Sequence, residues 1–465
     1  MSSSSPACAS QPLSQTFEQR RVTADAPVAL VTGAAGFIGS HVAEVCANRL
    51  GFAVVAVDDL SGGFARNLEP WISSGHSRFV RGDVQNRSFV SALFAEHGPF
   101  DYVYHLAAYA AEGLSHFVRE FNYNNNLGAS VLLLNHAVNQ EERTGRAVAR
   151  FVFTSSIAAF GAVEDPSELP MTEATPQRPE DPYGIAKHAF ELDLRAAGRM
   201  FGLPFTIFRP HNVYGPRQNI ADKFRNAVGI FMNQALRGEP LSIFGDGRQT
   251  RCFSYVDDVA PIIAASVLYP ATAGEDYFVG ADERTSVLEL ARLVATAMGQ
   301  PAQPVVHLDA RNEVLEAEAS HAKLRCAMAP WEPTPLAEGL RITAAYVRRH
   351  GARGFEPTGY RDVEVHKSMP ASWRAWLAQA DAVPSQPAAA AAAAASAVGG
   401  VPAKTTLPLL PSVGALPSAN ALLLSFALGL VAARTLALVW RWSSRPGDGT
   451  GLRMAKKRPS PRKAV

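Results

Sequence analysis

The sequence has few cysteines, four in 465 residues, and no two of them form a C-x-x-C pair. This wide spacing excludes a compact zinc motif and argues against a disulfide-stabilised scaffold. We therefore expect no metal site, and buried thiols in a reducing compartment. The four residues are Cys8, Cys46, Cys252 and Cys326.

The sequence also lacks a long apolar run near its N-terminus and a strong net charge. Residues 1–27 are serine-rich and carry no secretory signal, so we expect them to be disordered; a weak organellar transit peptide is the alternative. The formal charge is +2, with +7 on the residues after Trp440 and −5 on the rest. A mildly acidic body excludes nucleic-acid binding through net charge.

Short apolar runs alternate with amphipathic segments from Val28 to about Phe208. This pattern predicts an α/β fold, with a Rossmann-type, doubly wound parallel sheet in a domain over residues 28–208. Helices are expected at 128–138 and 183–201. The predicted strands are Val28–Thr32, Ala53–Val57, Arg78–Val80, Tyr102–His105, Arg150–Thr154 and Pro204–Phe208.

Residues 209–350 have longer loops rich in glycine, proline and asparagine, with helices expected at 223–237, 256–268 and 287–298. This region is predicted to form a smaller mixed α/β lobe that binds the substrate. Beyond Gly351 the periodic spacing of apolar residues fades. Residues 351–420 have the composition of a low-complexity linker, with an alanine run at 388–395.

Residues 421–440 form an apolar stretch whose single charge is Arg434. As a helix they would reach about 30 Å, the thickness of a bilayer's hydrocarbon core. We therefore expect a transmembrane helix that anchors the chain in a membrane, followed by a basic tail at 441–465, with the catalytic part in the cytosol. Because that tail would cross the membrane against the positive-inside tendency, partial insertion is an alternative, as is a buried amphipathic helix or a low-complexity tail.

Three glycines spaced G-x-x-G-x-x-G follow the first predicted strand: Gly33, Gly36 and Gly39. The first lets the chain turn sharply, the second lets the backbone approach a pyrophosphate, and the third lets the next helix pack closely on the sheet. Asp58 ends the second strand, where a carboxylate can bind an adenosine ribose and would repel a 2′-phosphate. The pattern predicts a dinucleotide site that prefers NAD to NADP; an ordinary βαβ turn is the alternative.

A second polar group follows the fifth predicted strand, at Ser155 and Ser156. About thirty residues later, Tyr183 and Lys187 share one helix face. A nearby ammonium lowers the pKa of a tyrosine, so this pair could supply a base near neutral pH. Alone, such a pair is usually found on a surface; beside a dinucleotide turn it indicates proton transfer.

Two glycine-containing loops, at 208–217 and 245–258, carry arginines and amides that suit a diphosphate, although each could be a plain turn beside a strand. In combination, these motifs resemble the extended short-chain dehydrogenase/reductase family, and within it the UDP-glucose 4-epimerases and related NAD-dependent nucleotide-sugar epimerases. The resemblance runs from about Ala29 to Tyr346. It includes Arg81-Gly82-Asp83-Val84, His105-Leu106-Ala107-Ala108, Asn125-x-x-Gly128, R-P-x-N-V-Y-G-P-R and G-D-G-x-x-x-R-x-F-x-Y-V-D-D.

The resemblance implies NAD as the cofactor and Ser156, Tyr183 and Lys187 as catalytic residues. It implies a homodimer paired through helices near 128–138 and 183–201. His211 stands where relatives often carry Phe, and its apolar neighbours favour a packing role. Asn212, Asn226, Arg251 and Arg311 would bind the nucleotide-sugar. Tyr183, Lys187 and the following residues would bind NAD: Gly33, Gly36, Phe37, Ile38, Gly39, Asp58, Asp83, Val84, Leu106, Ala107, Ala108 and Asn125.

By the same resemblance, Tyr183 takes the proton of the sugar 4-hydroxyl, Ser156 hydrogen-bonds that oxygen, and a transient 4-keto sugar forms and is reduced on its other face. Related 4,6-dehydratases and decarboxylases carry acidic residues where this chain has Ile157 and Ala158. Epimerisation of a UDP-sugar of the glucose/galactose type is therefore favoured. The alternatives are one of those nucleotide-sugar enzymes or a non-catalytic NAD-binding scaffold, and the sequence does not identify the sugar.

Overall fold

The computed structural model describes residues 13–17, 25–72, 76–163, 165–310, 314–329, 332–354 and 362–375. All of them belong to one compact unit, Met1–Pro384. The predictions for residues 421–440 and 441–465, for most of the linker and for Arg311 lie outside the described residues. In the part of the chain that is described, no helix combines the length and the apolar character needed to cross a bilayer.

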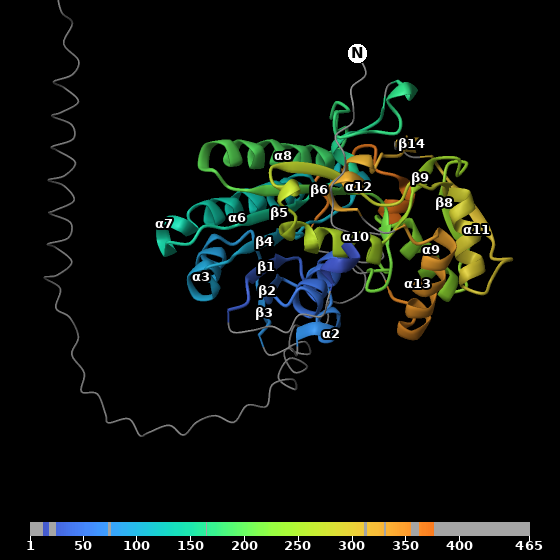
Figure 1. Cartoon of the computed structure of the whole chain (residues 1–465). Coiled ribbons are helices and arrows are strands. Elements are labelled where there is room, and N and C mark those ends of the chain that lie inside the picture. Colours follow the sequence, from blue (N-terminus) through green and yellow to red (C-terminus); the bar gives the residue numbers. More distant parts are fainter. Residues whose placement is uncertain are drawn as a thin grey trace, which may run out of the picture. The chain divides into compact units, whose positions relative to one another are not determined.

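A seven-stranded parallel sheet lies at the centre of this unit, in the order β11-β6-β5-β4-β1-β2-β3 (Figure 1). The order of strand addition reverses between β1 and β4, which is the switch point where doubly wound sheets bind ligands. The strands are β1 (Val28–Thr32), β2 (Ala53–Asp58), β3 (Arg78–Arg81), β4 (Tyr102–His105), β5 (Arg150–Thr154), β6 (Phe205–Pro210) and β11 (Glu275–Val279).

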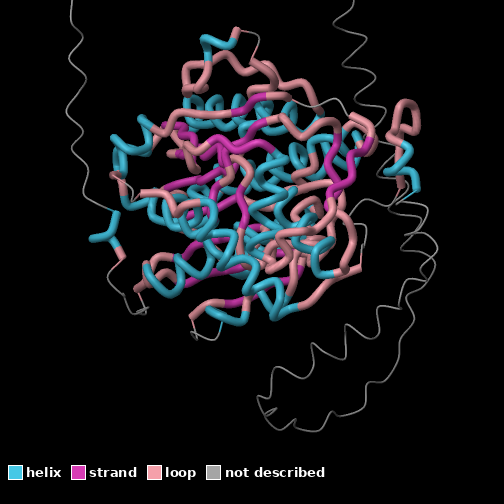
Figure 2. The backbone as a smooth tube through the Cα atoms, turned by 90° about the vertical axis from the view of Figure 1, so that its right-hand side faces the viewer, coloured by secondary structure: helices cyan, strands magenta, loops and turns pink. Residues whose placement is uncertain are grey.

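Helices cover both faces of the sheet, so the strands form an inner layer in Figure 2. On one face, α3 (Arg87–His97), α6 (Ala129–Val138) and α8 (Pro182–Phe201) pack against alternate strand residues such as Leu30. On the other face, α1 (Phe37–Glu44) and α10 (Val256–Ala265) pack against the residues in between, such as Ala29. Because both faces of the inner strands are buried, β1, β2 and β4 are almost continuously apolar rather than alternating.

The remaining elements include a second group of helices, α9 (Ala227–Leu236), α11 (Val287–Ala297) and α13 (Leu336–His350), which pack on one another. Short strands accompany them: β7 (Val213–Tyr214), β8 (Leu241–Phe244), β9 (Thr250–Cys252), β10 (Ser254–Tyr255), β12 (Arg284–Ser286), β13 (Val305–Leu308) and β14 (Glu316–Ala317). The other helices are α2 (Glu69–Ile72), α4 (Glu112–Ser115), α5 (Arg119–Tyr123), α7 (Gln140–Thr144) and α12 (Ala322–Met328).

The predicted boundary at residue 208 does not coincide with the edge of the sheet. Strand β11 and helix α10 come from the range predicted for the smaller lobe, yet β11 pairs with β6 and α10 packs on α1. The helix predicted at 223–237 begins only at Ala227, because its N-cap residue Asn226 has a left-handed backbone (φ +65°) that ends any helical run.

Three expectations about the chain outside the core need correction. The linker prediction is wrong for residues 362–375, where Met369 and Trp373 are buried. The disorder prediction is wrong for residues 13–17, where Leu13 is buried in the main core. Cys326 is disulfide-bonded, although Cys46 and Cys252 are buried free thiols as expected. Separation along the chain does not restrict which residues meet in the fold, so spacing could not exclude these contacts.

Candidate active site

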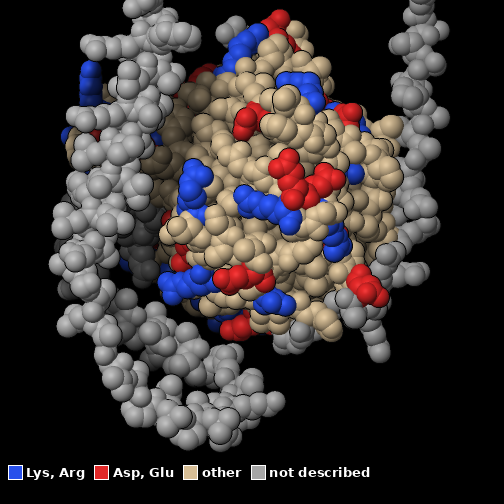
Figure 3. Space-filling model, turned by 90° about the vertical axis from the view of Figure 1, so that its left-hand side faces the viewer, with Lys and Arg blue, Asp and Glu red and all other residues tan. Residues whose placement is uncertain are grey.

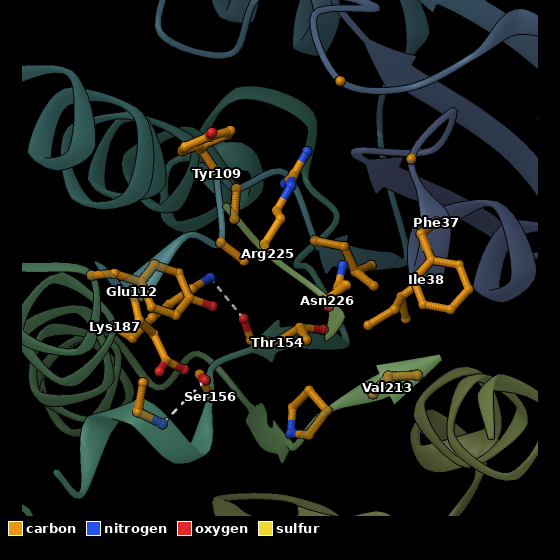
Figure 4. A pocket seen from close by; sticks show the side chains of 18 of the residues that line it. Phe37, Ile38, Tyr109, Glu112, Thr154, Ser156, Lys187, Val213, Arg225 and Asn226 are labelled. Carbon is orange, nitrogen blue, oxygen red and sulfur yellow. Dashed lines mark hydrogen bonds between the residues drawn. The ribbon is translucent and has the colours of Figure 1, made fainter. Parts of the chain in front are cut away.

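A cavity of about 480 Å³ opens at the carboxyl ends of the parallel strands, at the switch point. Every predicted site residue among those the structure describes lines this cavity. In the view of Figure 4, Ser156 and Lys187 lie toward one end and Phe37 and Ile38 toward the other, with Asn226 between them.

The glycine turn forms the Phe37 end of the cavity. Gly33 has a left-handed backbone (φ +70°), and a Cβ there would lie 2.8 Å from the backbone nitrogen of Ala107. A Cβ on Gly39 would lie 2.0 Å from the carbonyl oxygen of Gly33, so α1 can pack on the turn only through glycine. The first turn of α1 therefore presents N–H groups to the cavity, at the positive end of the helix dipole. This cradle fits the pyrophosphate of a dinucleotide.

Asp58 lies beside this turn with its side chain nearly buried. Its carboxylate accepts hydrogen bonds from the backbone nitrogens of Ala35 (3.0 Å) and Leu60 (2.8 Å). Burial raises the pKa of Asp58 to about 6, although those hydrogen bonds act in the opposite direction. The carboxylate is thus fixed at the end of β2, where the ribose of a bound dinucleotide would lie.

Asp83 and Asn125 are joined by a residue that no motif marked. The side-chain amide of Gln85 donates to Asp83 Oδ2 and to Asn125 Oδ1, each at 3.4 Å, and its backbone nitrogen donates to Asp83 Oδ1 at 2.8 Å. Two residues predicted to bind the cofactor from separate segments therefore form one wall of the cavity.

Ser156, Tyr183 and Lys187 meet because α8 packs closely on the turn after β5. A Cβ on Gly184 would lie 2.3 Å from the carbonyl oxygen of Ala158. Helix α8 begins here because Asp181 caps it, accepting a hydrogen bond from the Gly184 nitrogen at 3.0 Å, and Pro182 follows at its first position. A hydrogen bond joins the side chains of Tyr183 and Ser156.

The pKa of Tyr183 is shifted in the direction opposite to the one that the sequence predicts. Burial raises the pKa of Tyr183 above its ordinary value, and the carboxylate of Glu112 adds to this effect. The expected lowering by Lys187 is not found, because the Lys187 ammonium points to the carbonyl oxygen of Thr154 at 2.9 Å and lies 5.8 Å from the Tyr183 ring centre. Burial also lowers the pKa of Lys187, to about 7.

Buried hydrogen bonds to Glu191 fix both β6 and the turn after β5 to α8, the helix that carries Tyr183. Arg209 donates to Glu191 Oε2 at 2.7 Å, and both side chains are buried. Ser155 donates to Glu191 Oε1 at 2.5 Å. Burial raises the pKa of Glu191, but the hydrogen bonds from Arg209 and Ser155 outweigh it and leave that pKa below its ordinary value. Glu191 is therefore a charged anchor one turn beyond Lys187.

The residues predicted to bind the nucleotide-sugar differ in backbone conformation and in hydrogen-bond partners. Asn212 (φ +42°) and Asn226 (φ +65°) both line the cavity in left-handed conformations that asparagine adopts more readily than other non-glycine residues. Arg251 also lines it, and its guanidinium donates to the carbonyl oxygens of Val314 and Leu315. His211 lies outside the cavity, where it hydrogen-bonds His321 (Nε2–Nε2, 3.0 Å) and the Cys252 carbonyl.

Sequence patterns missed the side chains that surround Tyr183. Glu112, Tyr109 and Arg225 line the cavity from α4 and from the loops before α4 and α9. Arg225 lies 4.7 Å above the Tyr109 ring centre and pairs with Asp222 at 2.7 Å (Nε–Oδ2). No sequence motif predicts that these three segments meet at the cavity. The one indication in the sequence is that Arg225 directly precedes Asn226, a predicted site residue.

The chain is similar to proteins of known activity. The model of the NAD dependent epimerase/dehydratase family matches residues 29–280. UDP-glucose 4-epimerase of Mycolicibacterium smegmatis is 33% identical over 323 residues, which are 69% of this chain and 98% of the relative. The chain therefore belongs to the NAD-dependent epimerase/dehydratase family, and its cofactor is NAD.

Solved structures agree with this assignment. UDP-glucose 4-epimerase of Thermotoga maritima with UDP-glucose is 33% identical, with a TM-score of 0.62 over 70% of this chain and 99% of that one. The Thermus thermophilus UDP-glucose 4-epimerase complex with NAD is 31% identical, with a TM-score of 0.62 over 69% and 99%. Relatives of other activity also occur. A trifunctional Arabidopsis thaliana enzyme with UDP-glucose 4,6-dehydratase activity is 34% identical over 58% of this chain and 39% of the relative. A Xenopus tropicalis UDP-glucuronic acid decarboxylase is 29% identical over 69% of this chain and 72% of the relative.

Proposed function

We propose that this protein is a 4-epimerase of a UDP-sugar of the glucose/galactose type. The observation that carries the proposal is the meeting of Ser156, Tyr183 and Lys187 in one cavity in which Ile157 and Ala158, after the strand-end hydroxyls, are apolar. Neither of these two side chains can transfer a proton, so the elimination that a dehydratase requires has no acid–base pair at that point. The similarity to UDP-glucose 4-epimerases supports the same choice.

In this proposal Tyr183 is the general base. In its phenolate form, hydrogen-bonded by Ser156, Tyr183 takes the proton of the sugar 4-hydroxyl and becomes a neutral hydroxyl, while Ser156 hydrogen-bonds the oxygen that becomes a carbonyl. When bound, NAD supplies reversible hydride acceptance from sugar C4. Lys187 supports one wall by its bond to Thr154, while Asn212, Asn226, Arg251 and Arg311 hold the nucleotide so that the 4-keto sugar can turn over.

The direct test is to incubate the purified chain with a panel of UDP-sugars and to identify the products by chromatography. Interconversion of UDP-glucose and UDP-galactose, with no net NADH released, is the expected result. Formation of a 4-keto-6-deoxy sugar or of a pentose would contradict epimerisation, and would point to a dehydratase or a decarboxylase respectively. Complete inertness together with NAD binding would favour a non-catalytic scaffold.

We further propose a homodimer that uses α8. Four of the six exposed large hydrophobic side chains among the described residues lie on this helix: Ile185, Leu192, Met200 and Phe201. Ile185 and Leu192 are two turns apart on one face. On the left-hand side of Figure 1, where α3, α6 and α7 lie, acidic and basic side chains form small mixed groups with uncharged areas between the groups (Figure 3).

Sedimentation velocity should show a dimer for the wild-type chain in detergent and a monomer for Leu192→Glu, because a charge in an apolar interface is strongly unfavourable. Val306→Glu, which places the same charge on an exposed hydrophobic position of β13, should remain dimeric. A monomeric wild-type chain would refute the dimer, and dissociation of both variants would refute the placement of its interface on α8.

The last part of the proposal is a membrane anchor at residues 421–440, which rests on composition alone. When the chain is expressed with and without residues 401–465, only the full chain should stay in the membrane pellet after alkaline carbonate extraction. Leu428→Arg should release it, since a second arginine near the centre adds about 2.5–3.5 kcal/mol to the cost of insertion. Arg434→Leu should keep it in the pellet. A full chain that is found wholly in the soluble fraction would contradict the anchor.

A further inference from the structure

Residues 362–375, called here the C-terminal strap, pack against the part of the cavity that surrounds Tyr183. The strap follows α13 and lies outside residues 29–280, which the family model matches. Its Met369 and Trp373 side chains are each only 2% exposed, in a cluster with Tyr109, Leu114 and Phe224. A segment beyond the matched region therefore contributes to the core that supports the cavity.

The polar contacts of the strap hold the segment from α4 to α5. The Glu364 carboxylate accepts hydrogen bonds from the backbone nitrogens of Glu120 (2.6 Å) and Phe121 (2.9 Å), in the first turn of α5. The backbone nitrogens of Glu364 and Val365 both donate to the Phe117 carbonyl oxygen, at 2.8 and 3.2 Å. A carboxylate at a helix N-terminus is favoured by the helix dipole, so Glu364 ties the strap to α5.

Trp373 joins this segment to the loop before α9. Its ring lies edge-on to Phe117 (centroids 5.9 Å apart) and to Phe224 (5.1 Å). A Cβ on Gly113 would lie 2.9 Å from the indole, so the ring fills the space directly behind α4. The two segments that Trp373 contacts form one wall of the cavity, with Tyr109, Glu112, Gly113, Phe121, Phe224 and Arg225 as lining residues.

This wall lies near Tyr183, whose backbone nitrogen donates to the Ser115 hydroxyl of α4 at 3.2 Å. Glu112 and Arg225 are close enough to Tyr183 for their charges to act on its hydroxyl. Among the described residues, the side chains of Trp373 and Glu364 contact the segment from α4 to α5 and the loop before α9, rather than the glycine turn or the loops that carry Asp58 and Asp83. A change in the strap should therefore alter the sugar end of the cavity and leave the NAD end unchanged.

We infer that Trp373 is a positioning residue that, together with Glu364, fixes the cavity wall against which the sugar is held beside Tyr183. This inference rests on the proposed function, because it assigns the sugar to that end of the cavity. Through Phe224 and Gly113, Trp373 fixes the spacing between Glu112 and Arg225 across the bound sugar. The nucleotide depends on it less, because Asn212 and Arg251 lie in other segments and only Asn226 adjoins this wall.

The test uses the full chain with NAD bound and compares the affinities for UDP and for UDP-glucose by calorimetry, together with KM and kcat. Trp373→Ala should reduce the preference for UDP-glucose over UDP by about tenfold and raise KM similarly, because loss of a positioning wall lets the sugar shift. NAD affinity should stay unchanged, and UDP affinity should fall much less than UDP-glucose affinity. Trp373→Phe should restore most of the preference, since it keeps the ring and loses an indole N–H that has no hydrogen-bond partner within the described residues.

Glu364→Gln gives an independent measurement if Trp373→Ala fails to fold, and it should reduce the same preference because the amide is a weaker cap for α5. Lys367→Ala, at an exposed position of the same strap, should behave as wild type. Folded variants with an unchanged preference, or with equal losses for UDP and UDP-glucose, would overturn the inference. A wild-type chain that binds no UDP-sugar better than UDP would instead refute the proposed function, and the role of the strap with it.

Discussion

Replacing Tyr183 by phenylalanine is expected to lower the turnover of the UDP-sugar by about two to four orders of magnitude, the usual effect of removing a positioned base. Phenylalanine fills the same buried space against α4 and the β5 turn, so the fold and the NAD site should persist. The expected pattern is a large loss in kcat with little change in the dissociation constant for NAD. Steady-state kinetics and titration of the cofactor measure the two effects separately.

Tyr277→Phe is a matched control. It also removes the hydroxyl of a buried tyrosine, one that donates to the Ala271 carbonyl oxygen at 3.1 Å, but Tyr277 does not line the cavity. It should keep wild-type turnover. If Tyr183→Phe remains nearly as active as the wild type, the assignment of Tyr183 as the base is wrong.

Asp58→Ala is expected to weaken NAD binding by about ten- to a hundredfold, because hydrogen bonds to a charged group contribute about 1.5–3 kcal/mol each. NADP should be affected less, since the variant also removes the negative charge that repels a 2′-phosphate. The ratio of the dissociation constants for NADP and NAD should therefore decrease. Equilibrium titration of the cofactor-free chain with NAD and with NADP gives both constants.

The pH dependence supplies a second measure of the same residue. The carboxylate form of Asp58 binds the ribose, and burial raises its pKa to about 6 in the cofactor-free chain. Wild-type affinity for NAD should thus be complete well above pH 6 and fall as the pH is lowered through about 6, whereas Asp58→Ala should lack this dependence. Glu69→Ala, which removes an exposed carboxylate outside the cavity, should bind like the wild type. Tighter binding of NADP than of NAD by the wild type would refute the role of Asp58.

Local patterns predicted much of the fold because the interactions that define them are local. β1, β4 and β5 have the predicted bounds, and α8 begins one residue before the predicted Tyr183. Apolar runs bounded by glycine and helix caps depend on neighbours within a few residues, so the sequence alone marks them. The glycine turn, Asp58 and the Tyr183–Lys187 pair belong to this class.

Other features depend on contacts between residues that are distant in the sequence, and only the tertiary structure decided these. Strand β11 joins the sheet although it follows β6 by more than sixty residues, and Trp373 reaches back to Gly113. The direction of the Tyr183 pKa followed from burial, which the spacing to Lys187 does not reveal. The same holds for the placement of Glu112 and Arg225 around Tyr183. The sequence determined which chemical groups reach the cavity, and long-range packing determined their desolvation, their spacing and the wall that faces them, because these depend on what surrounds each group in three dimensions.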